Sequence, residues 1–518
     1  MVYNIYFFYK LSVTFIFNKY LKVGFIQKDT IRTVIISYLG LVLGYLNKGV
    51  LFVLILSTEQ IGLVNLILSV GILFSHLSNL GTINAIAKFA PFFDDRANQK
   101  KIFFQYALGF VVFGVIAVTL LSVLLQNKVV EFYSVKSSLF VDYYYWIIPI
   151  GIANVLFVVF ETYLRSIFNN VLAVFLNDFV LRVSVTILLS LLYFKVINFE
   201  SFFVYHVFVY FIPTSILLFY LVYKNELSFK KSNLRIPSKL RKVMLSYSLF
   251  SYTNTIGTLI VMTMDAMMIA YFLGLKATGI YTTVVYMTNA LQIPFKSLMR
   301  ISYPLVPIYW KKKDMDSMDS LYKKTSSVSL IVALFMFSIV WINIDELFSF
   351  LPNDFIEGIW VFFFLMMGRI VDMYLGLNGW ILITSKKYKF DMFFTGLLLL
   401  LVFGLNYFLI PIYGVVGAAI STGIAILTYN VARALYIGFV FKLKPIKKNQ
   451  VFVLFSFGTL LFLNYFIPVF ELDAIFSILI KSVIYSGVIA LVIIYFNMNQ
   501  DVTDFFIRYY NLIFKRSK

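Results

Sequence analysis

The sequence predicts an all-α integral membrane protein with about fourteen membrane-spanning helices. Hydrophobic residues make up 61% of the 518 positions, only 13% are charged, and the mean hydropathy is +0.89. A soluble domain carries roughly 25% charged residues. Apolar windows long enough to cross a bilayer fill most of the chain, and no alternating pattern indicates a barrel. Because backbone polar groups in lipid must be satisfied within their own segment, these windows are expected to be helices.

Residues 1–32 precede the first apolar window and differ from a cleaved signal. Their apolar stretch Val2–Phe17 is broken by Lys10 and is followed by Lys19 and Lys22 rather than by small residues. We expect an aromatic, basic helix that lies on the cytoplasmic membrane surface. The membrane-spanning windows that follow are 33–56, 62–87, 102–125, 143–163, 171–194, 201–223, 244–272, 280–308, 326–344, 356–383, 391–410, 413–437, 451–470 and 476–497.

The loops between these windows sort by charge. With a cytoplasmic N-terminus, most of the 44 Lys and Arg residues fall in loops on the cytoplasmic side. The outer side receives only Lys128, Lys136, Lys195, Lys276 and Lys481. One missed helix would invert every later loop, so this bias supports an even number of spans with both termini cytoplasmic. The net charge of +20 is therefore read as membrane topology in a bacterial inner membrane, and no nucleic-acid partner is expected.

A basic segment at 224–243 divides the chain into two six-helix lobes, 33–223 and 244–441. Residues 442–518 add the final two helices and a basic cytoplasmic tail. Each lobe has a Gly at the start of its second helix, Gly62 and Gly279, and prolines near the cytoplasmic end of that helix. Both lobes begin on the cytoplasmic side and contain an even number of helices, so they are predicted to be parallel repeats.

Three segments carry a resemblance to a known family. They are Thr58–Pro91, with TEQIGLVNLILSV and NLGTINAIAKFAP; Ser246–Val284, with an Asp in the seventh helix; and Asn406–Ala425, NYFLIPIYGVVGAAISTGIA. The chain resembles the polysaccharide-exporter flippases of the Wzx type, in the superfamily that includes multidrug and toxin extrusion (MATE) proteins and lipid II flippases. The family pattern often has Arg after the Asp of the seventh helix, whereas Ala266 follows Asp265 here.

The resemblance implies a MATE-like fold of two lobes around a central cavity that opens alternately to either side. It implies an undecaprenyl-diphosphate-linked oligosaccharide as cargo, flipped to the periplasmic face for O-antigen, capsule or exopolysaccharide synthesis. Membrane lipids are further expected partners, and a polysaccharide polymerase and a chain-length regulator are conceivable ones.

The residues themselves limit the chemistry. The chain has no Cys, and His76 and His206 lie too far apart for metal-ligand spacing, so we expect no metal site. The sequence contains no glycine-rich phosphate loop and no recognisable catalytic constellation. We therefore expect no bound cofactor and no nucleotide hydrolysis. Transport would draw on a proton or sodium gradient, on membrane potential, or on later consumption of the cargo.

Ionisable groups inside spans are costly, so each is a functional candidate. A diphosphate needs cationic partners at middle depth. Lys48, in the first span, is the foremost candidate, although it could instead extend its amine to the outer face. Lys296 and Arg300 share one face of the eighth span, where they line the cavity or bind lipid headgroups. Lys88 holds the comparable place in the first repeat, and an interface anchor is the alternative there.

The remaining in-span charges are candidates for coupling or gating. Asp178 with Arg182, spaced i,i+4, and Arg369 with Asp372, spaced i,i+3, are read first as self-neutralising pairs within one helix. Asp265 has no cation nearby in sequence, so it must pair across helices, bind a coupling cation or be protonated. His76 could sense protons, or it could be a packing residue with a hydrogen bond.

Two other functions stay open at the level of sequence. A cation-coupled exporter of small organic cations belongs to the same superfamily, but the excess of basic over acidic in-span groups favours an anionic cargo. A membrane polymerase or ligase of lipid-linked glycans would need a long outer loop to hold donor and acceptor. The longest outer segment, about Gln126–Asp142, is short for that purpose and carries no catalytic carboxylate pair.

Overall fold

A computed structural model describes residues 23–90, 97–167, 169–227, 238–446, 449–464 and 473–495. These ranges are helical and contain no β-strand. Ten of their helices are long and apolar enough to cross a membrane. The prediction of an all-α membrane fold is thus confirmed. The predicted interfacial segment before residue 23, the centre of the basic linker and the tail after residue 495 lie outside the described residues.

The chain forms two compact units. Unit 1 contains the described residues up to Ser57 and from Leu63 to Leu259, and unit 2 contains Thr58–Gly62 and the described residues from Ile260 onward. The units meet in sequence inside α14, which runs from Ser238 to Phe272. The lobe boundaries expected from the basic linker, and the count of fourteen crossings, stay predictions.

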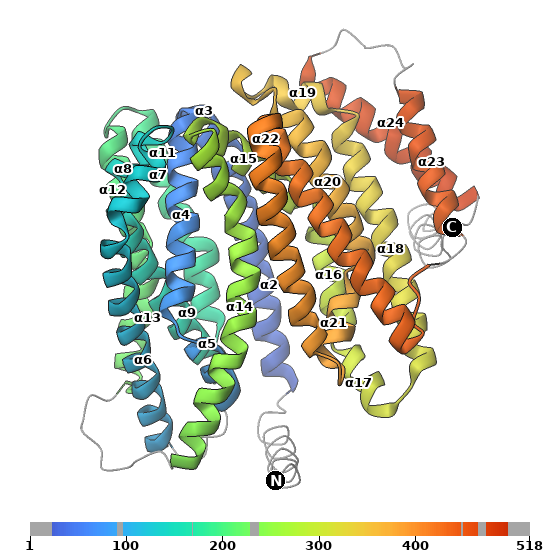
Figure 1. Cartoon of the computed structure of the whole chain (residues 1–518). Helices are drawn as coiled ribbons and strands as arrows, with labels where there is room; N and C mark the ends of the chain where they lie inside the picture. The colour runs from blue at the N-terminus through green and yellow to red at the C-terminus, as the bar shows by residue number, and fades with distance from the viewer. Residues whose placement is uncertain are drawn as a thin grey trace. The chain divides into compact units, whose positions relative to one another are not determined.

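Unit 1 is built from long helices that lie alongside one another (Figure 1). Its helices are α2 (Val23–Tyr45), α3 (Phe52–Ile55), α4 (Thr58–Ser78) from Leu63 onward, α5 (Thr82–Phe89), α6 (Ala97–Leu124), α7 (Gln126–Tyr133), α8 (Ser138–Asp142), α9 (Ile147–Ser166), α10 (Val171–Val174), α11 (Leu181–Tyr193), α12 (Phe199–Val209), α13 (Phe211–Tyr223) and the first half of α14. A core of aromatic and aliphatic side chains from α5, α6, α9 and α13 is fully buried.

Two spans of unit 1 contain a widened π-helical turn. The turn η1 (Leu46–Leu51) joins α2 to α3, and η4 (Phe175–Val180) joins α10 to α11. Such turns insert an extra residue into a helix and occur often at functional sites. Here they carry two of the predicted charged residues, Lys48 in η1 and Asp178 in η4.

Unit 2 contains the second half of α14 and the helices that follow it. They are α15 (Leu275–Leu291), α16 (Ile293–Ser302), α17 (Leu305–Lys312), α18 (Met315–Trp341), α19 (Ile344–Ser349), α20 (Gly358–Leu375), α21 (Leu377–Thr384), α22 (Lys389–Phe441), α23 (Asn449–Asn464) and α24 (Ala474–Tyr495). The eighth predicted span, 280–308, is broken into α15, α16 and the start of α17. Pro294 and Pro304 lie at these breaks, where the missing N–H of proline interrupts the helix.

The 53-residue α22 is a pair of antiparallel helices that reverse at Gly414. A straight helix of that length would extend about 80 Å, more than twice the thickness of a bilayer core. Gly414 has φ 60° and ψ −141°, a backbone conformation that favours glycine. Asn406 and Thr422, eight residues before and after it, both hydrogen-bond Asp265. The two predicted spans 391–410 and 413–437 therefore form a helical hairpin.

The start of α4 crosses α15 through two reciprocal glycines in unit 2. A methyl group on Gly62 would overlap the carbonyl of Leu275, and a methyl group on Gly279 would overlap the carbonyl of Thr58. Each glycine thus faces the backbone carbonyl of the residue four positions before the other glycine. This symmetric contact joins the two residues that sequence analysis matched between the repeats, and it requires close backbone approach.

We predict that Gly279→Leu lowers the thermal stability of the detergent-solubilised protein. The added side chain cannot move away from a backbone carbonyl, and overpacking of this kind costs about 1–3 kcal/mol. Thermal unfolding followed by circular dichroism measures the effect. Gly109→Ala is the matched control, since nothing lies within 4 Å of the added atom there. A Gly279→Leu protein as stable as the control would contradict the close crossing.

Within unit 2, the helix α24 is held by polar contacts to α19. Glu346 accepts hydrogen bonds from Lys481, as an ion pair, and from Ser477 at 3.0 Å. Asn343 adds a bond to Ser482 at 3.1 Å. Burial acts to raise the pKa of Glu346, but the bonds from Lys481 and Ser477 outweigh it and hold this pKa below the usual value.

A lowered folded-state pKa means that Glu346 stabilises the fold above its unfolded pKa, about 4.3, and loses this effect as the pH falls through the folded value. We therefore predict that wild type loses more thermal stability than Glu346→Gln when the pH falls from neutral to below about 4. The excess loss should be roughly 1–2 kcal/mol, because one charge-assisted contact is involved. Melting curves across pH measure it, and parallel curves would show that the contact contributes nothing.

Candidate functional site

In unit 1, the structure brings Lys48 and Arg182 together. Lys48 is half-buried and donates a hydrogen bond from Nζ to Oδ1 of Asn65 at 3.1 Å. Arg182, on α11, lies close enough to repel the charge of Lys48. Asn47 connects the two elements, since its Nδ2 donates to the carbonyl of Arg182 at 2.8 Å and its Oδ1 accepts from Thr186 at 2.7 Å. Two cations therefore share a small polar region on the first and fifth spans.

The predicted pairing of Asp178 with Arg182 is wrong in this structure. Asp178 accepts a hydrogen bond from Ser37 at 2.7 Å, and Arg182 donates to the carbonyl of Gly40. Both partners lie on α2. The reason is the π-helical turn η4, which ends between the two residues and removes the regular i,i+4 alignment. Sequence reasoning assumed an uninterrupted helix and so missed the two contacts to α2.

In unit 2, Lys296 and Arg300 lie on one exposed face of α16, as their spacing predicted. Lys296 is near enough to Arg369 and Asp372 to interact with both charges. Arg300 has no hydrogen bond or ion pair within the described ranges. The opposite face of α16, with Phe295 and Met299, is buried. This helix thus presents two cations away from the core of its unit.

The predicted pairing of Arg369 with Asp372 is also wrong in this structure. Arg369 donates to Oδ1 of Asn289 on α15 at 3.2 Å, and Asp372 accepts from Nδ2 of Asn430 on α22 at 3.2 Å. The two half-buried side chains point to different neighbouring helices, and each finds an amide there. Asn289 and Asn430 are contacts that sequence reasoning missed.

Asp265 pairs across helices, one of the three possibilities that its isolation left open. It is 8% exposed and accepts hydrogen bonds from Tyr281 on α15, from Asn406 at 2.7 Å and from Thr422 at 2.7 Å. Arg369 adds a more distant positive charge. A carboxylate held by neutral oxygen and amide groups is a ligand set that suits a small hard cation or a proton. Asn406 and Thr422 both belong to the motif Asn406–Ala425, which was the signal for them.

Lys88 and His76 lie apart from these clusters. Lys88, on α5, is exposed, and its Nζ is 3.6 Å from the centre of the Tyr247 ring, a cation–π contact. His76 is half-buried, and no hydrogen-bond partner of its Nδ1 is found among the described residues. Neither residue contacts Lys48 or Arg182 in this structure, so unit 1 has one shared cationic region rather than a single site that includes all four residues.

A buried ion pair joins the two halves of α22. Arg433 donates to Asp391, and both are under 8% exposed. The Arg433 guanidinium also lies 4.2 Å from the centre of the Tyr429 ring and 3.5 Å from Asn378. Arg433 lies inside the predicted span 413–437, and Asp391 is the first residue of the predicted span 391–410. The pair closes the open end of the hairpin that reverses at Gly414.

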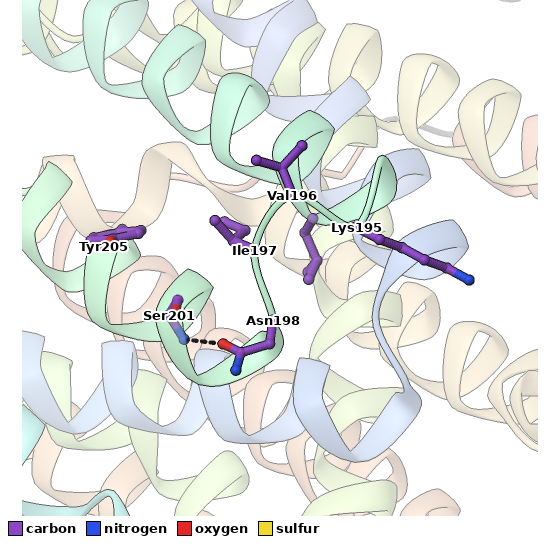
Figure 2. Close-up of a pocket in the computed structure, with 7 residues that line it drawn as sticks. Lys195, Val196, Ile197, Asn198, Ser201 and Tyr205 are labelled. Carbon is purple, nitrogen blue, oxygen red and sulfur yellow. Dashed lines mark hydrogen bonds between the residues drawn. The ribbon is translucent and has the colours of Figure 1, made fainter.

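A wide, shallow pocket of about 660 Å³ lies between the end of α11 and the start of α12 (Figure 2). Asn198 caps α12 there by accepting a hydrogen bond from the backbone N–H of Ser201 at 2.9 Å. None of the predicted site residues borders it. Its lining residues are Leu192, Lys195, Val196, Ile197, Asn198, Ser201 and Tyr205. Lys195 points away from the polar cap, so the pocket does not gather charge.

Residues 26–310 match the model of a family described as "Polysaccharide biosynthesis protein". No curated protein sequence matches the chain.

Among solved structures, an inward closed conformation of the lipid II flippase MurJ aligns over 90% of this chain and 100% of its own, with 14% identity and a TM-score of 0.69. An inward-facing multidrug resistance MATE family transporter aligns over 78% of this chain and 96% of its own, with 12% identity and a TM-score of 0.61. The MATE multidrug transporter DinF-BH aligns over 82% of this chain and 98% of its own, with 14% identity and a TM-score of 0.57. At these identities the likeness establishes the shared fold.

Proposed function

Because the chain belongs to the polysaccharide biosynthesis protein family, we propose that it is a flippase for an undecaprenyl-diphosphate-linked oligosaccharide. It moves the diphosphate and its sugars from the cytoplasmic to the periplasmic face of a bacterial inner membrane by alternating access. The product supplies O-antigen, capsule or exopolysaccharide synthesis. The fold shared with a lipid II flippase supports a lipid-linked cargo.

The observation that carries this proposal is the positive charge gathered in each of the two units. Arg300 is exposed and unpaired among the described residues, and Lys296 lies one turn away on the same face. In unit 1, Lys48 and Arg182 lie close enough to repel each other. An anion that enters such a region relieves this repulsion, and a diphosphate accepts several charge-assisted hydrogen bonds at once. A cargo of organic cations would meet groups of its own charge and be repelled.

Asp265 is proposed as the coupling group. The lipid-linked cargo is bulky and anionic, so its passage needs a driving force, and a buried carboxylate can bind a proton or a sodium ion in exchange. Tyr281 and Thr422 supply the hydroxyl oxygens that a cation would share with Asp265, whereas Asn406 faces Asp265 through its amide nitrogen. Since Asp265 contacts α15 and both halves of α22, a change in its charge acts on three helices.

We predict that Lys48→Ala and Arg300→Ala each reduce flipping roughly tenfold or more, because each removes a charge-assisted contact to the diphosphate. In a host depleted of the native protein, single lipid-linked repeat units should accumulate on the cytoplasmic face. Lys128→Ala, which removes an exposed lysine on α7, is the control and should behave as wild type. Normal transport in a well-expressed variant would remove that residue from the site.

The depletion strain also tests the function itself. Loss of surface glycan with repeat units on the cytoplasmic face would support a flippase. Normal glycan with raised sensitivity to cationic drugs would point to an exporter of organic cations. Repeat units on the periplasmic face would point to a polymerase or ligase.

We predict that Asp265→Asn abolishes the response of transport to an imposed ion gradient. The variant is nearly isosteric and keeps hydrogen bonds to its neighbours, but it cannot gain or lose a charge. Flipping in proteoliposomes under an inward or outward sodium or proton gradient measures this. Asp316→Asn, an exposed residue at the start of α18, is the control. Equal gradient dependence in Asp265→Asn and wild type would exclude Asp265 as the coupling group.

A further inference from the structure

Two aromatic rings form a fixed pair at the end of α16. The rings of Tyr303 and Trp380 are stacked, with centroids 4.8 Å apart and planes 22° from parallel. The indole Nε1 of Trp380 donates a hydrogen bond to the carbonyl of Tyr303 at 2.8 Å. The pair thus ties α21 to the C-terminus of α16. Trp380 remains 37% exposed, although one ring face and its N–H are occupied by Tyr303.

This pair continues the cationic face of α16. Lys296, Arg300 and Tyr303 are spaced i, i+4 and i+7, which places them along one side of the helix. Lys296 and Arg300 are both exposed within the predicted eighth span, where contact with hydrocarbon would cost several kcal/mol. Their face therefore meets water or a ligand rather than lipid tails. Tyr303 lies at the end of that face, and Trp380 stacks against it.

The indole hydrogen bond argues against an ordinary membrane anchor. Tryptophans of the interfacial belt direct the ring toward lipid and leave the N–H for headgroups and water. In Trp380 the N–H is given to a backbone carbonyl of the same unit, and what remains exposed is apolar ring. A rigid, half-exposed aromatic surface beside cations matches a pyranose ring, which has an apolar C–H face and is linked to a phosphate.

The distances along the helix agree with one continuous ligand. Arg300 and Tyr303 are separated by three residues, about 4.5 Å along the helix axis. A diphosphate held by Lys296 and Arg300 would place its attached sugar one turn further on, beside Tyr303 and Trp380. We propose that the Tyr303–Trp380 pair binds the sugar next to the diphosphate by stacking. This inference rests on the proposed function and assigns the sugar-binding part of the same site.

The test uses the full-length protein in nanodiscs and two probes. One probe is undecaprenyl diphosphate, and the other is undecaprenyl diphosphate that carries a single N-acetylhexosamine. Dissociation constants are measured for wild type, Trp380→Leu, Trp380→Phe and Arg300→Gln. Trp360→Leu is the matched control, because Trp360 is also exposed but lies in the first turn of α20. Trp380→Phe keeps an aromatic ring and guards against a trivial folding defect.

We expect wild type and Trp360→Leu to bind the sugar-bearing probe roughly tenfold more tightly than the bare one. Trp380→Leu should bind both probes equally, with unchanged affinity for the bare probe, while Trp380→Phe keeps most of the preference. Arg300→Gln should weaken binding of both probes by the same factor. These results together would separate sugar contact from phosphate contact.

Other outcomes would overturn the inference in distinguishable ways. If Trp380→Leu still binds the sugar-bearing probe more tightly than the bare one, or if it weakens the binding of both probes equally, the Tyr303–Trp380 pair does not bind sugar. If wild type binds both probes equally, the sugar contact is excluded while the proposed function stands. If wild type binds neither probe, the proposed function fails, and the sugar site fails with it.

Discussion

The high cost of a charged side chain in a hydrocarbon environment governs how this protein is built. Unit 2 meets that cost in three ways. Arg433 and Asp391 neutralise each other in a buried pair. Asp265 is surrounded by neutral donors. Lys296 and Arg300 are left on an exposed face of α16. Only the third solution leaves the charge exposed to a bulky anionic ligand, so the packing itself distinguishes the candidate cargo-binding charges from the buried ones.

The same constraint explains where the helices are broken. A helix carbonyl already accepts a hydrogen bond within its own helix, so a charged side chain reaches its second lone pair only where two helices approach closely. The carbonyl of Gly40 accepts from Arg182, and a methyl group on Gly40 would overlap the backbone of Asp178. The π-helical turn at Phe175–Val180 and the glycine on α2 together allow this approach. In unit 2, the reversal at Gly414 brings Asn406 and Thr422 to the same carboxylate.

Sequence alone was sufficient for the fold class, since hydrophobic length determines it, but it did not predict the breaks that divide the eighth predicted span into α15, α16 and α17. It also matched Gly62 with Gly279, which proved to contact each other reciprocally. It failed where partners come from different helices. Spacing along one helix suggested that Asp178 pairs with Arg182, but a π-helical turn moved each toward α2. Local spacing carries no information about amides on neighbouring helices, so it could not identify Asn289 and Asn430 as the hydrogen-bond partners of Arg369 and Asp372.

The two units differ in the charges that they hold, and this difference bears on how the charge of Asp265 could be coupled to diphosphate binding. The polar region around Lys48 contains cations held by amides and carbonyls, whereas unit 2 also buries carboxylates. Neutralising Asp265 with a proton or cation would weaken its attraction for the more distant Arg369, which interacts with Lys296 on the cationic face. The charge state of Asp265 would therefore change the positive potential met by a diphosphate on α16. Because linkage is reciprocal, bound diphosphate would in turn alter the affinity of Asp265 for its cation. Coupling of this kind needs only electrostatic contact within unit 2.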